Sequence, residues 1–496
     1  MAAPDSSHQT GQRRAATERL CGILQELTAE LHPHLRGRSV VSLDSHLVRD
    51  LGIDSLGRME LLARLERAFG VSIPEQALFT TETVHEVLAV VLAAAPAGLI
   101  TAAREPPPAA AALLAAPTQA ATLCEVLDWH AKHAPERAHI YLHTGNGLEE
   151  MITFRSLRSQ AGAIAAGLLA QGLAPGTPVA IMLPTGREYF FSFFGVLLAG
   201  GVPVPIYPPM GRAQLAEHVV RHARILANAE TPILITVAEA KPLAQWLRAH
   251  APALRAIVTV AELAASVPAG APAPRQGSDL ALLQYTSGST GNPKGVMLTH
   301  ADLLSNIRIM GEVTRASSTD LFVSWMPLYH DMGLIGAWLG SLYFGMPLAV
   351  MSPLTFLAHP ERWLWTIHRY RATLSGAPNF GYELCLKRVD DTRLAGLDLS
   401  SWRMAFNGAE PVSPDTLERF HARFARYGLK REALAPVYGL AECALGLTFP
   451  PPDRGPLIDR IQREEFMRTR QAIPAEPGGV AGGLGSAVAV VQGTYI

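Results

Sequence analysis

A run of small hydroxyl residues, glycines and one lysine occupies residues 285–295, written YTSGSTGNPKG. Glycine allows close backbone approach, and hydroxyl and ammonium groups donate hydrogen bonds to phosphate oxygens. The run fails the Walker A pattern, which, if it began at Gly288, would require glycine where Pro293 stands. Residues 296–300 also favour a strand, where a Walker A loop continues into a helix. We interpret the run as another kind of phosphate-binding loop; an ordinary glycine–serine turn is the alternative that composition leaves open.

A second candidate for chemistry is a serine at the start of a predicted helix. Residues 51–56, LGIDSL, lead into residues 54–70, where apolar side chains recur every three or four positions and predict an amphipathic helix. The N-terminus of a helix favours a phosphate group, because free N–H groups and the positive end of the dipole lie there. Ser55 is therefore placed to carry a phosphodiester. The alternative is that Asp54 or Ser55 only caps the helix.

The elements around these residues predict two structural classes. Residues 15–92 favour a small helical unit, and residues 93–121, rich in alanine and proline, favour a linker. Farther on, apolar strands alternate with helical patterns, which predicts parallel sheets covered by helices. The predicted strands are 178–184, 202–207, 232–237, 256–260 and 280–286, and the predicted helices include 155–171, 187–199 and 214–229.

Bulk composition narrows the class of protein. A chain of 496 residues is expected to hold more than one domain. The formal net charge of −1 gives no reason to expect a nucleic acid or an anionic membrane as partner. Four cysteines without a CxxC pair favour a reducing, cytoplasmic location and no metal framework. The apolar run 189–207 ends in glycines and prolines, so we expect a buried helix followed by a strand and no membrane span.

These motifs resemble two known families. The LGIDSL stretch, its helix and the linker behind it resemble an acyl carrier protein, a four-helix bundle whose serine, here Ser55, is esterified with 4′-phosphopantetheine by a phosphopantetheinyl transferase. The loop at 285–295 resembles the signature loop of the adenylate-forming superfamily. WMPLYHDMGLIG (325–336), NGAEP (407–411) and VYGLAE (437–442) follow in that family's order. The chain is identified as a carrier domain followed by a fatty-acyl-AMP ligase.

The resemblance implies roles for individual residues. The ATP phosphates would be held by the signature loop, namely Thr286, Ser287, Gly288, Ser289, Thr290, Gly291 and Lys294. The adenosine would lie along two later motifs, at Gly408, Ala409, Glu410, Tyr438, Gly439, Leu440 and Ala441. Glu442 would bind Mg²⁺, and His330 would stand at the mouth of the acyl pocket; with Lys294 these form the expected catalytic set. Taken alone, His330 is as well interpreted as a packed histidine and Tyr438 as a core aromatic residue.

Three features favour a fatty acid as the substrate. The phrase LYHDMGLIG carries a His-Asp pair typical of fatty-acyl-AMP ligases, and Ala441 stands where acyl-CoA synthetases usually have threonine. The segment after Glu442 resembles the insertion that disfavours coenzyme A, and the carrier precedes the ligase. An amino-acid adenylation domain of a peptide synthetase is the alternative. Expected partners after loading are polyketide synthases, peptide synthetases or acyltransferases.

The end of the sequence departs from the family. No lysine follows Lys430 and no aspartate follows Asp459, although the family needs both farther along the chain. We therefore expect an incomplete AMP-binding domain at 122–477 and an uncharged, glycine-rich tail at 478–496. The expectation is a C-terminally truncated chain with impaired activity. The alternative is a carrier and binding module without ligase activity of its own.

Overall fold

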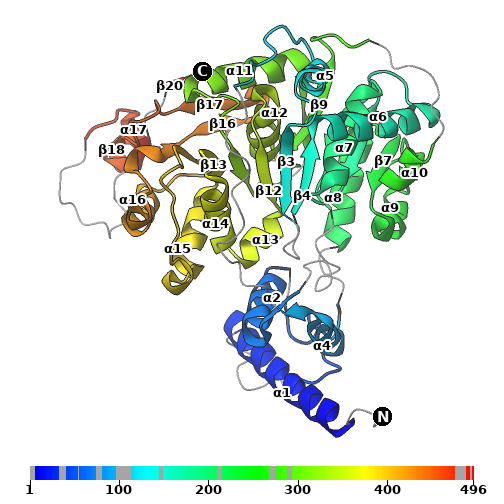
Figure 1. The fold of residues 1–496 in the computed structure, drawn as a ribbon, viewed down its shortest axis with the longest axis vertical. Coiled ribbons are helices and arrows are strands. Elements are labelled where there is room, and N and C mark those ends of the chain that lie inside the picture. The colour runs from blue at the N-terminus through cyan, green and yellow to red at the C-terminus, as the bar shows by residue number, and fades with distance from the viewer. Residues whose placement is uncertain are drawn as a thin grey trace.

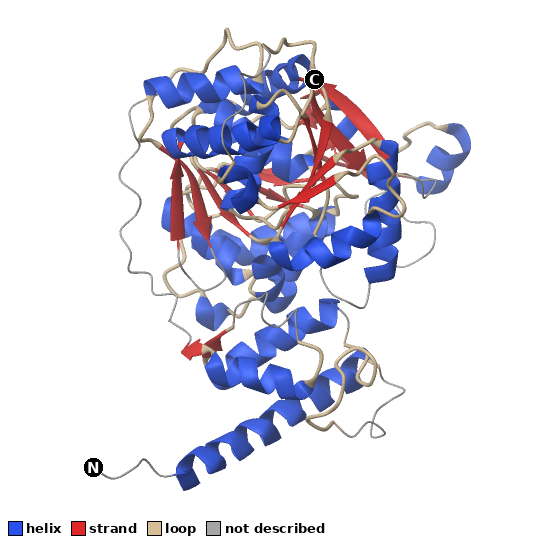
Figure 2. Ribbon diagram, turned by 90° about the vertical axis from the view of Figure 1, so that its right-hand side faces the viewer, coloured by secondary structure: helices blue, strands red, loops and turns tan. Residues whose placement is uncertain are grey.

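The protein divides into an N-terminal helical unit and a larger α/β part, which lie end to end (Figures 1 and 2). The structure is a computed structural model that describes residues 6–32, 41–53, 55–73, 81–96, 113–143, 149–208, 215–266, 274–286, 293–474, 488–491 and 494–495. The N-terminal helical unit comprises the described residues up to 96, and the α/β part comprises those from 113 onward.

The N-terminal helical unit has three described helices around a leucine-rich core: α1 (Ser6–Leu31), α2 (Ser55–Phe69) and α4 (Val84–Ala93). Helix α4 starts with a capping box, in which Thr83 and Glu86 satisfy each other's backbone N–H groups. Strand β1 (Val71–Ser72) pairs antiparallel with β2 (Ala95–Pro96). A fourth helix of the predicted bundle stays a prediction, because residues 33–40 and 74–80 lie outside the described ranges.

The largest sheet of the α/β part has seven strands in the order β15-β14-β13-β11-β12-β3-β4. All neighbours pair parallel except β3 and β4, which form an antiparallel edge. The strands are β3 (Ala138–His143), β4 (Glu149–Thr153), β11 (Phe322–Ser324), β12 (Leu348–Met351), β13 (Leu374–Ala377), β14 (Met404–Asn407) and β15 (Leu434–Pro436).

A second, four-stranded sheet is wholly parallel, with the order β6-β5-β7-β8. Its strands are β5 (Pro178–Met182), β6 (Val202–Pro205), β7 (Ile233–Thr236) and β8 (Ala256–Val258), and α6 (Phe154–Ala170), α7 (Arg187–Leu198) and α8 (Leu215–Asn228) lie between strands in the sequence. These positions confirm four of the predicted strands and the three predicted helices. The α/β fold with parallel sheets covered by helices is therefore confirmed.

The fifth predicted strand behaves differently. Strand β9 (Leu280–Thr286) pairs antiparallel with β10 (Lys294–Thr299) in a hairpin of its own, so the expectation of parallel pairing is wrong there. The reason is the length of the connection. A parallel crossover needs roughly a dozen or more residues, and the candidate phosphate loop between the two strands is shorter than that.

Further elements surround the two sheets. The helices are α5 (Leu123–His133), α9 (Lys241–Leu247), α10 (Val260–Ala264), α11 (His300–Thr314), the π-helix η4 (Met332–Leu339), α12 (Gly340–Phe344), α13 (Pro353–Ala358), α14 (Glu361–Tyr370), α15 (Asn379–Arg388), α16 (Pro414–Phe424) and α17 (Arg463–Thr469). Short 3₁₀ turns are η3 (Ala238–Ala240), η5 (Asp391–Arg393), η6 (Ala425–Tyr427), η7 (Arg431–Ala433) and η8 (Ala441–Cys443). The last strands are β16 (Tyr438–Leu440), β17 (Leu445–Phe449), β18 (Ile458–Ile461), β19 (Val488–Val491) and β20 (Thr494–Tyr495).

The largest apolar cluster among the described residues includes the contact between α7 and the π-helix η4. The indole of Trp338 is fully buried, with its ring centroid 4.7 Å from Phe190 and 5.2 Å from Phe193. Helix α7 buries nearly its whole surface and runs on to the buried strand β6, as the apolar run 189–207 predicts. Among the described residues, every helix is too short or too polar to cross a membrane.

We expect Trp338→Ala to destabilise the α/β part by about 3–5 kcal/mol, because truncating a buried tryptophan leaves a cavity. The free energy of unfolding, measured with urea, checks this. Trp246→Ala is the matched control: its indole is 66% exposed, so its removal should change the free energy by less than about 0.5 kcal/mol. Equal losses in the two variants would contradict the placement of this core.

Candidate active site

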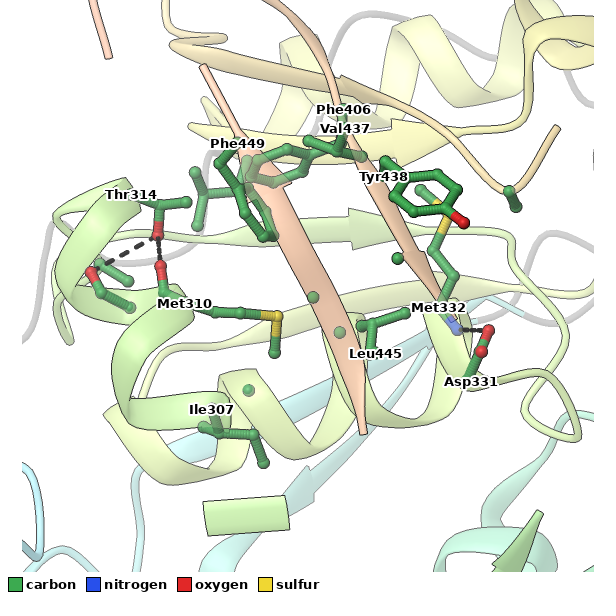
Figure 3. Close-up of a pocket in the computed structure, with 18 of the residues that line it drawn as sticks. Ile307, Met310, Thr314, Asp331, Met332, Phe406, Val437, Tyr438, Leu445 and Phe449 are labelled. Atoms are coloured by element: carbon green, nitrogen blue, oxygen red, sulfur yellow. Dashed lines mark hydrogen bonds between the residues drawn. The ribbon is translucent and has the colours of Figure 1, made fainter. Parts of the chain in front are cut away.

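A cavity of about 310 Å³ opens among α11, η4, α12, the ends of β13 and β14, and the β16–β17 hairpin. One side of it is apolar and includes Ile307, Met310 and Phe449, whereas Asp331 and Tyr438 lie toward the other side (Figure 3). A largely apolar cavity with a few polar groups at one end is typical of a small-molecule site.

Two features of the backbone shape the polar end of the cavity. Ala409, just past the carboxyl end of parallel strand β14, has a φ of 65°, which is uncommon for a residue with a side chain. A Cβ added to Gly439 would lie 1.7 Å from the carbonyl oxygen of Leu445, so only glycine fits there. Ligands of parallel sheets bind beyond the carboxyl ends of the strands, and strained backbone collects at such sites.

The candidate phosphate loop spans the turn of the β9–β10 hairpin. Thr286 ends β9 and pairs in register with Lys294 at the start of β10. The Thr286 residue lines the cavity, and the Lys294 side chain is exposed beside it in the ladder but does not line it. Ser287, Gly288, Ser289, Thr290 and Gly291 lie outside the described residues, so their part in binding stays a prediction.

His330 and Asp331 form a pair at the mouth of the cavity. His330 Nδ1 lies 2.8 Å from Asp331 Oδ1, which also accepts the backbone N–H of Met332 at 2.7 Å, at the start of η4. Burial lowers the pKa of His330, but the hydrogen bond and charge of Asp331 outweigh burial, and the pKa is raised overall. Asp331 thus has two roles: it accepts an N–H at the start of η4, and it raises the pKa of His330.

Tyr438 and Glu442 stand at the rim of the cavity. The Tyr438 side chain is 60% exposed, which is unusual for a large aromatic residue and leaves its ring free to stack on a planar ligand. Glu442 is exposed in η8, next to Cys443, which is also exposed. Tyr438 is 60% exposed and the His330 side chain is 48% exposed, so these exposures do not support a core tyrosine and a packed histidine.

Among the predicted site residues that the structure describes, eight line this one cavity: Thr286, His330, Ala409, Tyr438, Gly439, Leu440, Ala441 and Glu442. Lys294, Gly408 and Glu410 do not line it. The Glu410 carboxylate instead accepts the backbone N–H of Phe380 at the start of α15, at 2.5 Å. Ser55 is the first residue of α2, as predicted, and its side chain lies outside the described residues. The role of each residue stays a prediction.

Sequence reasoning missed two kinds of residue. The motif LYHDMGLIG gives Asp331 no role of its own, although an acidic residue just before an apolar helical run is a signal for a helix start. The apolar side chains Ile307, Met310 and Phe449 come from α11 and β17, and no local pattern distinguishes them from ordinary core residues.

Comparison with known proteins agrees with both parts of the chain. Residues 127–463 match the family described as AMP-binding enzyme, and residues 18–91 match the phosphopantetheine attachment site family. Among solved structures, the fatty acyl-adenylate ligase of Legionella pneumophila, in complex with acyl adenylate and pyrophosphate, is similar with a TM-score of 0.66 and 35% identity; the match covers 75% of this chain and 63% of that one.

Two curated relatives carry related names. A medium-chain-fatty-acid–[acyl-carrier-protein] ligase of Teredinibacter turnerae is 34% identical over 387 residues, covering 70% of this chain and 60% of the relative. A second protein with that activity in its name, from Moorena producens, is 38% identical over 331 residues, covering 66% of this chain and 55% of the relative. The chain thus spans little more than half the length of these relatives. Because the family match extends over more than half of its residues, the chain belongs to the AMP-binding enzymes.

Proposed function

We propose that the chain activates a fatty acid with ATP to an acyl-AMP and transfers the acyl group to a phosphopantetheine thiol on a carrier domain. One observation carries this proposal: residues from four separate motifs line one cavity whose far side is apolar. The polar end suits a nucleotide, and the apolar side suits an acyl chain. The names of the relatives and of the Legionella pneumophila structure support the same chemistry.

The first step is a phosphoryl-group substitution. An oxygen of the fatty-acid carboxylate attacks the α-phosphorus of ATP, the bond from that phosphorus to the bridging oxygen breaks, and pyrophosphate leaves. Such a transfer depends on positioning and on stabilising charge more than on a protein nucleophile. Thr286 and the exposed Lys294 at the ends of the hairpin are suited to hold the phosphates, and Tyr438 to stack on the adenine.

The second step is an acyl transfer. The pantetheine thiolate attacks the acyl carbonyl carbon, a thioester forms, and AMP leaves with the electron pair of the broken mixed-anhydride bond. We assign the attachment point to Ser55, at the N-terminus of the 15-residue helix α2, where a phosphodiester is favoured by free N–H groups. A phosphopantetheinyl transferase would install the arm, and polyketide synthases, peptide synthetases or acyltransferases are the proposed acceptors.

A magnesium ion fits the site through Glu442. Mg²⁺ in nucleotide sites is commonly held by one or two carboxylates together with substrate phosphates and water. Glu442 offers an exposed carboxylate at the cavity rim. When bound, the ion would neutralise negative charge on the phosphates.

The decisive experiment is fatty-acid-dependent exchange of labelled pyrophosphate into ATP by the 496-residue chain. We expect exchange, and we expect Tyr438→Ala to lower kcat/KM for ATP by roughly tenfold to a hundredfold, the effect of losing a base–aromatic stack. Tyr438→Phe is the matched control and should retain the wild-type value, because it keeps the ring. Absence of exchange in the wild-type chain would instead favour the interpretation as a carrier and binding module.

Loading of the carrier is tested separately. Incubation with a phosphopantetheinyl transferase and coenzyme A should raise the mass of the chain by one phosphopantetheine, and Ser55→Ala should abolish the increase. Ser42→Ala, a substitution at another serine of the same unit, should leave the increase intact. Intact-protein mass spectrometry gives the measurement. An unchanged wild-type mass would remove the attachment site from the proposal.

We propose that Asp331 holds His330 in its protonated form at the cavity mouth. Asp331→Asn should lower the pKa of His330, because the variant loses the carboxylate charge while its amide oxygen still accepts the Met332 N–H. An NMR titration of the His330 ring measures this. Asp453→Asn removes a carboxylate that is 80% exposed and should leave the His330 pKa unchanged. A His330 pKa that stays at its wild-type value in Asp331→Asn would contradict the proposed role.

A further inference from the structure

The apolar core of the N-terminal helical unit continues into the α/β part. Ala358, on α13, is 6% exposed and belongs to the same cluster as the buried leucines of the unit. Leu354 and Leu357 of α13 pack against that cluster. We call α13, the adjoining His359 and the end of α15 at Arg388 the docking face. Its centre is apolar, as in the core of a specific protein interface.

Two ion pairs surround this apolar centre. The Glu66 carboxylate bonds His359 Nε2, and both side chains are mostly buried, at 9% and 14% exposed. Glu60 pairs with Arg388 at 2.7 Å. Both carboxylates come from α2, the helix that Ser55 begins, and both partners come from the α/β part. The buried Glu66–His359 pair favours one specific arrangement, because separation leaves a buried charge without its partner, whereas the Glu60–Arg388 pair is more exposed.

Two basic residues of α2, Arg58 and Arg64, are engaged within the N-terminal helical unit itself. Arg58 donates to the carbonyl oxygen of Thr81 at 2.6 Å, and Arg64 bonds Glu30 at 2.6 Å and Glu60 at 2.9 Å. The mixed charge of this helix therefore has a structural explanation. Arg58 and Arg64 bond within the unit, and the Glu60 and Glu66 carboxylates reach the docking face.

The docked position lies apart from the cavity. In Figure 1 the N-terminal helical unit is at the lower end of the molecule, next to α13, and the labels of α12, β16 and β17, which border the cavity, lie in the upper half. All residues that line the cavity come from the α/β part, between Thr286 and Phe449.

We propose that the docking face is a specific binding site for helix α2 of the chain's own N-terminal helical unit, and that it holds this unit in a parked position away from the acyl cavity. In the structure the N-terminal helical unit occupies this face, and the contact has an apolar centre and ion pairs of opposite charge. The idea that this position keeps the carrier away from the cavity rests on the proposed function. The docking itself does not depend on catalysis.

His359 makes this docking depend on pH. It faces Glu66 from α2, and Glu361 and Arg362 from α14; Arg393 bonds Glu361 at 2.8 Å, and Arg388 holds Glu60 nearby. Burial lowers the pKa of His359, but hydrogen bonds to Glu361 and Glu66 outweigh it and raise the pKa overall. Burial also opposes ionisation of Glu361, yet its bond to His359 holds its pKa at about 2. Docking is thus favoured while His359 is protonated, and this contribution is lost as pH rises through the raised pKa.

Arg388→Glu in the full chain tests the docking face, because it sets a carboxylate against Glu60. We expect a larger radius of gyration in small-angle X-ray scattering and a loss of amide-exchange protection of about tenfold or more in 353–359, since like charges in contact cost several kcal/mol. Lys387→Glu makes the same charge change one residue away, at a side chain that is 73% exposed and pairs with Glu383. This control should match the wild type, and unchanged protection of α7 shows that the fold is intact in both variants.

Three results would overturn the proposal. Arg388→Glu behaving like Lys387→Glu would show that the face does not hold the unit. Loss of docking on dilution of the wild-type chain would show that the docked unit comes from a second copy. A radius of gyration that does not increase with pH through the His359 titration would remove the role of His359. The supporting result is an increase in the wild type that His359→Gln abolishes.

Discussion

The π-helix η4 is the element on which the candidate site depends, because it belongs to the core and to the cavity at once. On one side, Trp338 is buried among aromatic rings of α7. On the other, Met332 and Gly336 line the cavity. A π-helical turn is rare and frequently occurs at functional sites. The tight packing of the indole therefore fixes the position of the cavity wall that η4 forms, and Asp331 caps the first turn of η4.

The opposite wall is held by backbone contacts. Gly439 of β16 lies against the carbonyl of Leu445 in β17, and Ala409 keeps a left-handed conformation after β14. The left-handed backbone of Ala409 is strained, and a rigid surrounding structure maintains it. The cavity thus lies between η4 on one side and the β16–β17 hairpin with the end of β14 on the other, and both sides are held in place by packing. A reaction that depends on the orientation of its substrates requires such a rigid site.

The sequence predicts the features that depend on neighbouring residues, namely the helices, the strands and the short motifs. Apolar runs bounded by glycine or proline at one or both ends predict the strands 178–184 and 232–237 and the helix 187–199. Each of the motifs that meet at the cavity is also recognisable in the sequence by itself. The antiparallel hairpin at β9 was missed because strand pairing depends on loop length and partners. The contact between Glu66 and His359 joins residues 293 positions apart, and no pattern in the sequence relates them. The apolar lining from α11 and β17 is a product of tertiary packing for the same reason.

The last residue of the short turn η8 is Cys443, whose exposed thiol is suited to chemical labelling. Cys443 follows Glu442 and is exposed, whereas burial raises the pKa of Cys124 to about 12 and raises the pKa values of Cys21 and Cys385. A thiolate is the form that reacts with maleimides and similar reagents, so a buried thiol of raised pKa reacts slowly. Cys443 is therefore a native labelling position, and a fluorophore attached there would sit beside the cavity rim without any engineered cysteine.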